Sequence, residues 1–584
     1  MLTDLQARVG ICGLCRILYE HATKPGTTSQ EVKCVRVGSS LAESINGLPF
    51  LSIVIGPGLT AAPTDMQRGF PKMPDAGSRA EFLLLNKWIQ DCDKKHKCGP
   101  KADADIRAPT RLIDVGDEAN PDTLRLDCST TRDRPLRYVA LSHRWGSKKQ
   151  HPRFCTYNHN IEHFKKGIDF QSLPKTFQDA VKVTKGLGIR FLWIDSLCII
   201  QEDPEDWKAE CQRMEDVFSA AYCTIAASCA SGTTDGFLKP RPKRHCVVID
   251  TQWCDKPSRI YICEALDNFR SDVEQGELSK RGWVYQERAL SRRTIHFTEK
   301  QVYWECGEGV RCETLTKMFK YVTFSDNESC SGTAPCPNLN QVELTCISRR
   351  AAFIADPDFP QSTLQYYQGM KIKFFENLYE QYSKLEFTEK TDKSTGIMGL
   401  EKRLVSTYNT QGHYGILDRF LGRSLLWGRV PNAMDMERIT YPDDQKVPSW
   451  SWMAVDGAMV YMDVPFDSVE WNKEIQSPFR SAANGGGASQ ILDLGAVARD
   501  FTAVEAVDFI LDRPSTTEET KNLKCVVIGT EKLGEPSDVQ LHYVLLVAPK
   551  HTRIDCVEYE RVGVAILKRK DILSKGVGLN VQIV

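Results

Sequence analysis

The sequence lacks an excess of charge of either sign. Its 584 residues include 75 Lys and Arg against 76 Asp and Glu, which gives a formal net charge of −1. Proteins that bind nucleic acid or an anionic lipid surface usually present a field of positive charge. We therefore expect no nucleic acid and no anionic membrane surface among the partners of this protein.

Long apolar runs are also absent. A helix needs about 20 apolar residues to span a bilayer, and the best run here, Leu48–Ile55, is short and contains Pro49. The first residues, MLTDLQARVG, include an acidic residue and lack the apolar core of a secretory signal. These features predict a cytoplasmic protein with no membrane span, whose 21 cysteines are reduced thiols or metal ligands rather than disulfides.

The signatures of several enzyme classes are missing as well. The sequence contains no serine elbow with its His and Asp partners, no Walker phosphate loop and no complete dinucleotide fingerprint. Asn484–Gly487 lacks the strand–turn–helix context of a phosphate loop, so we expect a flexible loop there and another at Ser325–Cys336. Any enzymatic activity must therefore depend on other residues.

The central region, residues 135–290, alternates short apolar runs with amphipathic segments. Three of the runs predict buried strands: Tyr138–Ser142, Phe191–Ile194 and Cys223–Ala227. A helix that Pro174 opens separates the first two runs, and a helix from Pro204 to Ala221 separates the last two. Strands joined by helices require right-handed crossovers, which predicts an α/β fold with neighbouring parallel strands.

The flanking regions follow other patterns. Residues 1–134 are irregular and rich in Cys, with one amphipathic helix expected at Ser78–Cys92. Residues 291–584 mix helix and strand, with a helix expected at Leu364–Leu385. Three apolar runs near the end predict antiparallel strands: Lys524–Ile528, His542–Val547 and Val562–Leu567. We therefore expect a multi-region chain with a mixed α+β C-terminal region.

Four ordered motifs mark the central region: Tyr138–Gly146 (YVALSHRWG), Leu192–Gln201 (LWIDSLCIIQ), Glu210–Ala227 and Arg281–Arg288 (RGWVYQER). Together they resemble the fungal heterokaryon-incompatibility (HET) domain family. The second motif of that family often ends Ile-Asn-Gln, whereas Ile200 precedes Gln201 here, which puts a role for an amide at this position in doubt. Four further segments resemble sequences that flank the domain in its larger members: Cys92–Cys98, Tyr303–Cys306, Pro448–Trp452 and Tyr559–Gly563.

The resemblance implies a role in fungal allorecognition, in which activation of the domain leads to growth arrest or programmed cell death. The family has been likened to TIR domains, signalling modules of innate immunity of which some cleave NAD. The resemblance thus implies a TIR-like parallel-sheet core. It leaves two mechanisms open: an enzyme that acts on NAD or a related nucleotide, or a non-catalytic module that self-associates or recruits other incompatibility proteins and death effectors.

Polar side chains follow two of the predicted strands directly. The first strand ends with Ser142, His143, Arg144, Trp145 and Gly146, and the second ends at Asp195. Ligands of parallel sheets bind outside the carboxyl ends of the strands, and this combination of groups suits a ligand with a phosphate and a base, such as NAD. The alternative is a structural rim in which Arg144 pairs with Asp195 and Trp145 fills the core.

Glu210 is a second candidate for catalysis, beside Asp195. At 3.6 residues per turn it projects from the apolar stripe of its predicted helix, and a carboxylate in such a place needs a partner or a raised pKa. One interpretation is a catalytic carboxylate that stabilises charge on the ribose as a glycosidic bond breaks. The other is a structural anchor for Arg144 or for nearby backbone.

The N-terminal region contains a candidate zinc site. Cys12 and Cys15 have the spacing of a zinc knuckle, and Cys92, His96 and Cys98 provide the further ligands that a structural zinc ion needs. The alternative is that these thiols are small apolar side chains of the core.

Overall fold

The computed structural model describes residues 2–23, 34–37, 40–43, 49–55, 67–96, 98–100, 108–129, 136–253, 256–315, 317–318, 356, 358–431, 433–442, 445–479, 493–502, 509–513, 522–532, 537–550, 558–572 and 578–584. The predicted loops at Ser325–Cys336 and Asn484–Gly487 lie outside the described residues. The chain forms two compact units. Unit 1 comprises Met1–Lys280 and Glu287–Asp358, and unit 2 comprises Arg281–Gln286 and Phe359–Val584.

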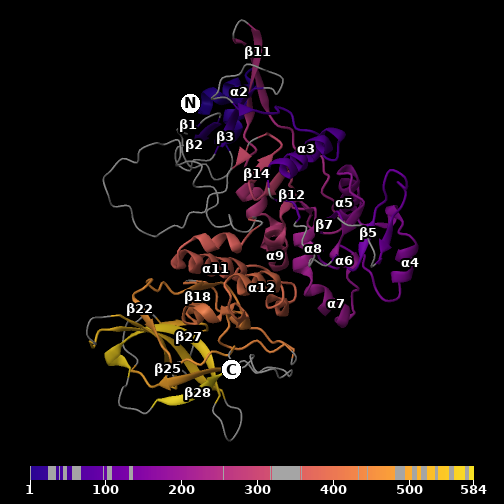
Figure 1. The fold of residues 1–584 in the computed structure, drawn as a ribbon. Coiled ribbons are helices and arrows are strands. Elements are labelled where there is room, and N and C mark those ends of the chain that lie inside the picture. The colour runs from indigo at the N-terminus through magenta and orange to yellow at the C-terminus, as the bar shows by residue number, and fades with distance from the viewer. Residues whose placement is uncertain are drawn as a thin grey trace. The chain divides into compact units, whose positions relative to one another are not determined.

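A nine-stranded sheet, ordered β15-β14-β13-β12-β9-β7-β8-β5-β6, forms the centre of unit 1 (Figure 1). Its strands are β5 (Leu112–Asp114), β6 (Arg125–Asp127), β7 (Tyr138–Ser142), β8 (Phe191–Trp193), β9 (Cys223–Ala226), β12 (Arg293–Phe297), β13 (Val302–Cys306), β14 (Gly309–Cys312) and β15 (Lys317–Met318). β7 pairs in parallel with both β8 and β9, which confirms the predicted parallel neighbours.

The sheet as a whole is mixed rather than parallel. β12 continues the parallel set beside β9, but β13, β14 and β15 add antiparallel strands at one edge, and β5 and β6 do so at the other. The edge strands come from sequence on both sides of residues 135–290, so the sheet is larger than the predicted central region. Short connections such as β13–β14 permit only antiparallel pairing.

The helices of unit 1 begin and end at local signals. They are α1 (Leu2–Arg8), α2 (Gly13–Ala22), α3 (Arg79–Lys95), α4 (Ile161–Lys166), α5 (Lys175–Gly186), α6 (Asp195–Cys198), α7 (Pro204–Cys211) and α8 (Met214–Ala220), and α9 (Gly282–Leu290) starts in the unit 2 segment. The Ser78 side chain caps α3, and Asp203 caps α7 with Pro204 in its first turn. The predicted helix from Pro204 to Ala221 is broken by a turn at residues 212–213, where Arg213 donates to the carbonyl of Ala108 (2.6 Å).

A second sheet of unit 1 joins two segments that are distant in sequence. Its strand order is β1-β2-β3-β11-β10, with β4 beside β3. The strands are β1 (Cys34–Val37), β2 (Ser40–Glu43), β3 (Pro49–Ile55), β4 (Gln67–Arg68), β10 (Cys246–Trp253) and β11 (Lys256–Glu264). The hairpin β10–β11 therefore leaves the central region and pairs with the N-terminal strand β3. The sequence patterns did not predict this hairpin.

The described residues of unit 2 combine helices with a seven-stranded, mostly antiparallel sheet. The helices are α11 (Gln368–Ser383), α12 (Met398–Thr407) and α13 (Leu421–Leu425). The sheet contains β22 (Val469–Trp471), β23 (Leu494–Arg499), β24 (Phe509–Leu511), β25 (Lys524–Glu531), β26 (Leu541–Lys550), β27 (Glu558–Lys568) and β28 (Leu579–Ile583). Smaller pairs are β16 (Gly412–His413) with β17 (Ile416–Leu417), β18 (Trp427–Arg429) with β21 (Met459–Tyr461), and β19 (Glu437–Arg438) with β20 (Val455–Asp456).

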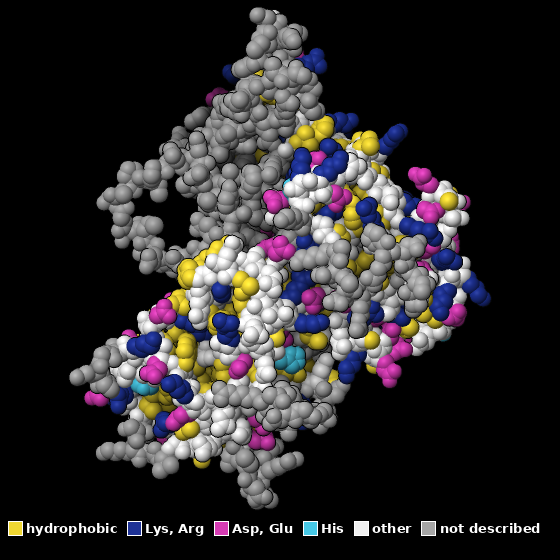
Figure 2. Space-filling model, viewed as in Figure 1, with side chains coloured by type: hydrophobic (Ala, Val, Ile, Leu, Met, Phe, Trp, Pro, Cys, Tyr) yellow, Lys and Arg dark blue, Asp and Glu magenta, His cyan; other side chains and the backbone are white. Residues whose placement is uncertain are grey.

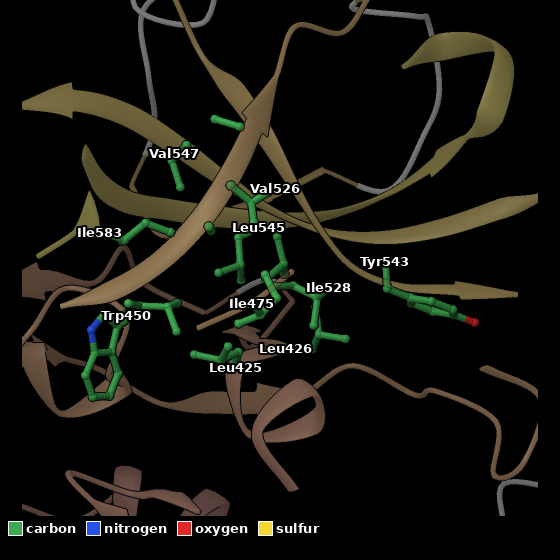
Figure 3. Packing of buried hydrophobic residues seen from close by; sticks show 14 of the residues in the cluster. Leu425, Leu426, Trp450, Ile475, Val526, Ile528, Tyr543, Leu545, Val547 and Ile583 are labelled. Atoms are coloured by element: carbon green, nitrogen blue, oxygen red, sulfur yellow. The ribbon is translucent and has the colours of Figure 1, made fainter. Parts of the chain in front are cut away.

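The buried residues of the unit 2 sheet form a large cluster on one face and a smaller cluster that includes the alternating residues Cys525, Val544 and Leu546. Leu545 of β26 and Val526 of β25 belong to the larger cluster, together with Leu425 and Trp450 from the preceding segments (Figure 3). The predicted antiparallel strands are confirmed, because β26 pairs antiparallel with both β25 and β27. The described part of the chain is therefore mixed α and β throughout.

The surface carries both signs of charge. Where side chains are described, Lys and Arg lie among Asp and Glu on the face seen in Figure 2. Within the described residues, none of the helices has the length and apolar character that a bilayer-spanning helix requires.

Candidate functional site

The carboxyl ends of β7 and β8 form a polar rim. Ser142 is the last residue of β7, and α6 begins at Asp195 directly after β8, so the parallel pairing brings the two predicted segments to one edge of the sheet. Asp195 accepts a hydrogen bond from the indole N–H of Trp145 (2.7 Å) and one from the backbone N–H of Ser196 (2.6 Å). Nδ1 of His143 lies 3.8 Å from Oδ1 of the same carboxylate.

Arg144 does not pair with Asp195 as the structural interpretation expected. Its Nη1 lies 3.2 Å from Oε2 of Glu277, and both side chains are partly exposed. The indole N–H of Trp145 takes the place beside Asp195 instead. Arg144 therefore faces solvent at the rim, and the side chain of Asp195 also remains 28% exposed.

Gly146 permits a close contact between two loops of the rim. Its φ is +71°, and a Cβ there would lie 2.2 Å from Cδ2 of His151. His151 is buried and also lies against Gly232, while its Nδ1 is 2.6 Å from Oγ1 of Thr234. The loop after β7 and the loop after β9 are thus held together through one imidazole, which requires glycine at both contacts.

The rim has a buried carboxylate that the sequence analysis did not single out. Glu287 of α9 accepts a hydrogen bond from the hydroxyl of Ser142, and both residues are buried. One turn later on the same chain, Ser291 lies 2.7 Å from Thr224 of β9. Glu287 lies within the fourth motif, Arg281–Arg288, and this position in the motif is the sequence feature that could have indicated it as a site residue.

Arg288, the residue after Glu287, belongs to a second buried charge cluster. Arg288 donates two hydrogen bonds to Glu305 of β13 (2.9 and 2.8 Å), and Nε2 of His296 is 2.9 Å from the same carboxylate. The ring of Phe269 lies edge-on to His296. The fourth motif is therefore joined to the Tyr303–Cys306 segment by a bidentate ion pair.

Glu210 lies in a buried environment with a hydroxyl and two guanidinium groups around it. Its side chain is 3% exposed, and Oε1 accepts a hydrogen bond from the hydroxyl of Thr110 (2.7 Å). Two guanidinium groups flank the same oxygen, with Arg213 at 3.7 Å and Arg111 at 3.9 Å. Arg111 also holds Asp206 through both carboxylate oxygens. These contacts tie α7 to the segment before β5.

The predicted zinc ligands do not all converge. Ligand atoms of Cys92, His96, Cys98 and Cys306 lie within 4.8 Å of one another, and this is the group among the described residues that can hold a metal ion. Cys12 and Cys15 are not part of it. Cys12 precedes α2 as its N-cap, where its sulfur accepts a hydrogen bond from the backbone N–H of Cys15 (3.4 Å). Cys306, the last residue of β13, completes the group instead.

The four ligand groups come from two of the flanking segments noted in the sequence. Cys92 lies in the last turn of α3, His96 is its C-cap and Cys98 follows. All three cysteines are buried. Hydrogen bonds from the thiols of Cys92 and Cys98 hold the pKa of Cys306 below its usual range. The cluster is therefore a compact N/S donor set, the chemistry that Zn²⁺ prefers.

Residues 138–287 match the family model described as Heterokaryon incompatibility protein (HET). The match runs from the first residue of β7 into α9 and ends at Glu287. No curated protein and no solved structure matches the chain. The family resemblance is confirmed for this region, and no solved structure supports the likeness to TIR domains.

Proposed function

We propose that this chain acts in heterokaryon incompatibility as a cytoplasmic protein, in which residues 138–287 trigger or regulate cell death. The match of this region to the HET family carries the proposal. The rim supports it, because three of the four family-like motifs meet there through Trp145 with Asp195 and Ser142 with Glu287.

Within this role we propose a non-catalytic mechanism, in which the rim binds a second copy of the chain or another incompatibility protein. In the alternative mechanism the rim holds NAD and Glu210 stabilises charge on its ribose. That mechanism requires the carboxylate of Glu210 to face a ligand. The contacts of Glu210 with Thr110, Arg111 and Arg213 suit an anchor instead.

The exposed part of the rim is the surface that a partner would contact. Arg144 offers a guanidinium that forms a partly exposed ion pair with Glu277, and pairs near the surface are worth about 0–1 kcal/mol. A carboxylate on a partner protein can therefore displace Glu277 at small cost. Asp195, bound to Trp145, provides an acceptor on the same rim.

The test is inducible expression in a filamentous fungus, with growth arrest as the readout. Arg144→Ala should abolish growth arrest and reduce self-association or partner capture, while the purified variant unfolds at the wild-type denaturant concentration. Arg259→Ala is the control, because Arg259 is another arginine of unit 1 whose ion pair, with Asp250 in the β10–β11 hairpin, is exposed. It should behave as wild type.

Two outcomes would overturn the proposal. If the folded wild-type chain causes no growth arrest at any expression level, the cell-death role is wrong. If purified protein releases nicotinamide from NAD, and this activity parallels growth arrest across the variants, the non-catalytic mechanism is wrong and the enzymatic alternative replaces it.

A further inference from the structure

We propose that Cys92, His96, Cys98 and Cys306 bind one Zn²⁺ ion in a structural Cys3His centre. The inference is independent of the cell-death role, since it rests on side-chain geometry in unit 1. Four neutral or anionic N/S ligands with no carboxylate form a typical structural zinc site, and four protein ligands leave no open position for a substrate.

The spacing of the ligand atoms fits one tetrahedral ion. Zinc–sulfur bonds of about 2.3 Å and zinc–nitrogen bonds of about 2.0 Å place neighbouring ligand atoms roughly 3.5–3.8 Å apart. Sγ of Cys306 lies 3.7 Å from Nδ1 of His96, and no two ligand atoms of the group are more than 4.8 Å apart. Movements of about 1 Å or less therefore complete the coordination.

Arg293 provides the charge that such a centre requires. Three thiolates and a neutral imidazole around Zn²⁺ carry a net charge of −1, which is costly to bury without a counterion. Arg293 is 1% exposed. Its Nε donates to the carbonyl of Cys98 (3.2 Å) and its Nη2 to Asp93 (2.6 Å).

The remaining nitrogen of that guanidinium supports the same conclusion. Among the described atoms, Nη1 of Arg293 is buried and has no hydrogen-bond partner. Cys92 is among the groups that interact with Arg293 electrostatically. A metal-bound thiolate would interact with this buried nitrogen, so Arg293 is a positioning residue for the centre.

The ion would connect the end of α3 to strand β13 of the nine-stranded sheet. Cys92 and His96 are supplied by the end of α3, and Cys306 by β13. Arg293, the first residue of β12, and the preceding Arg292 reinforce the connection, because both donate to the backbone at Cys98 or Gly99. The centre thus stabilises the junction between the N-terminal region and the strands that follow the matched region.

The first experiment measures metal in the full-length protein, purified without chelators. Elemental analysis should give one zinc per chain. Cys306→Ser should lose the zinc, whereas the double variant Cys12→Ser/Cys15→Ser should keep it. Cys223→Ser is a further control, since Cys223 is a buried thiol of β9 outside the group. Wild-type protein without stoichiometric zinc would overturn the proposal, and so would zinc retained in folded Cys306→Ser.

Two measurements keep the proposal testable if Cys306→Ser fails to fold. Wild-type protein exchanged with Co²⁺ should show the visible bands of a tetrahedral site and thiolate-to-cobalt charge transfer, and octahedral bands would overturn the proposal. Arg293→Gln should weaken zinc retention against a competing chelator by about 10–100-fold. Arg311→Gln is its control, because Arg311 lies near Asp91 instead (3.6 Å). Equal retention in the two variants would refute the role of Arg293.

Discussion

Glu210→Gln separates an anchor from a catalytic carboxylate through its effect on stability. The substitution keeps the volume of the side chain and an oxygen that accepts the hydrogen bond from Thr110, but it removes the charge beside two guanidinium groups. At separations of 3.7 and 3.9 Å, each attraction is roughly 4 kcal/mol gross at an effective dielectric of about 20. Desolvation of the buried carboxylate offsets much of this sum.

We expect a net loss of about 3 kcal/mol, at the lower end of the range of 3–5 kcal/mol for breaking a buried pair. The lower end applies because Arg111 keeps Asp206 and Arg213 keeps the carbonyl of Ala108. The loss should appear in urea unfolding and in faster amide exchange of α7. Since the chain has two compact units, amide exchange identifies the unit that is destabilised.

Two further variants complete this test. Glu205→Gln changes an exposed carboxylate of the same helix and should alter stability by less than about 0.5 kcal/mol. Combining Glu210→Gln with Arg213→Met should show a coupling of about 1–3 kcal/mol, because the two side chains share one contact. Wild-type stability of Glu210→Gln together with a loss of growth arrest would refute the anchor and favour catalysis.

Three other perturbations have defined outcomes. Gly146→Ala should cost at least about 1–3 kcal/mol and reduce growth arrest, because the residue has a positive φ and its Cβ would overlap His151; normal stability in urea would contradict this. Burial raises the pKa of Glu313 to about 7, above its unfolded value of 4.5. The free energy of unfolding should therefore fall as the pH rises from about 5 to 7. Glu313→Gln should remove this fall when unfolding is measured as a function of pH. Burial lowers the pKa of Lys393 to about 8, below its unfolded value of 10.5. Between these pH values the unfolded chain therefore binds more protons than the folded chain. Stability of unit 2 should therefore rise by up to about 1.4 kcal/mol per pH unit above pH 8, and a Lys393→Met variant with the same rise would disprove the assignment.

The sequence was informative where periodicity and chain order dictate structure. Fully buried runs separated by helices allow few topologies, so the parallel neighbours of β7 could be predicted before any coordinates. The same pattern could not show the mixed edges of the sheet, because β5, β6 and β13 come from segments without that alternation. The β10–β11 hairpin was missed because its partner, β3, lies far away in the chain.

For the site residues, too, the sequence indicated which segments come together but not which side chains pair. The predicted strand order placed Ser142 and Asp195 on one rim. Which side chains pair there depends on their lengths and directions, and Trp145 rather than Arg144 binds Asp195. The spacing of Cys12 and Cys15 resembled a metal site, although it serves to cap α2. The fourth member of the metal group, Cys306, lies more than 200 residues from Cys98, so no local spacing could identify it.

The nine-stranded sheet also determines which fragments of this chain can be expected to stay monomeric rather than aggregate. A fragment cut to residues 138–287 would lack β12, the parallel partner of β9, and β5, the partner of β8. Both sides of its remaining three strands would then present unpaired backbone groups, and β11 would lose β3. Open edges of this kind template association between copies. Aggregation of such a fragment would therefore result from the choice of its ends. It would not be evidence that the intact protein associates with itself.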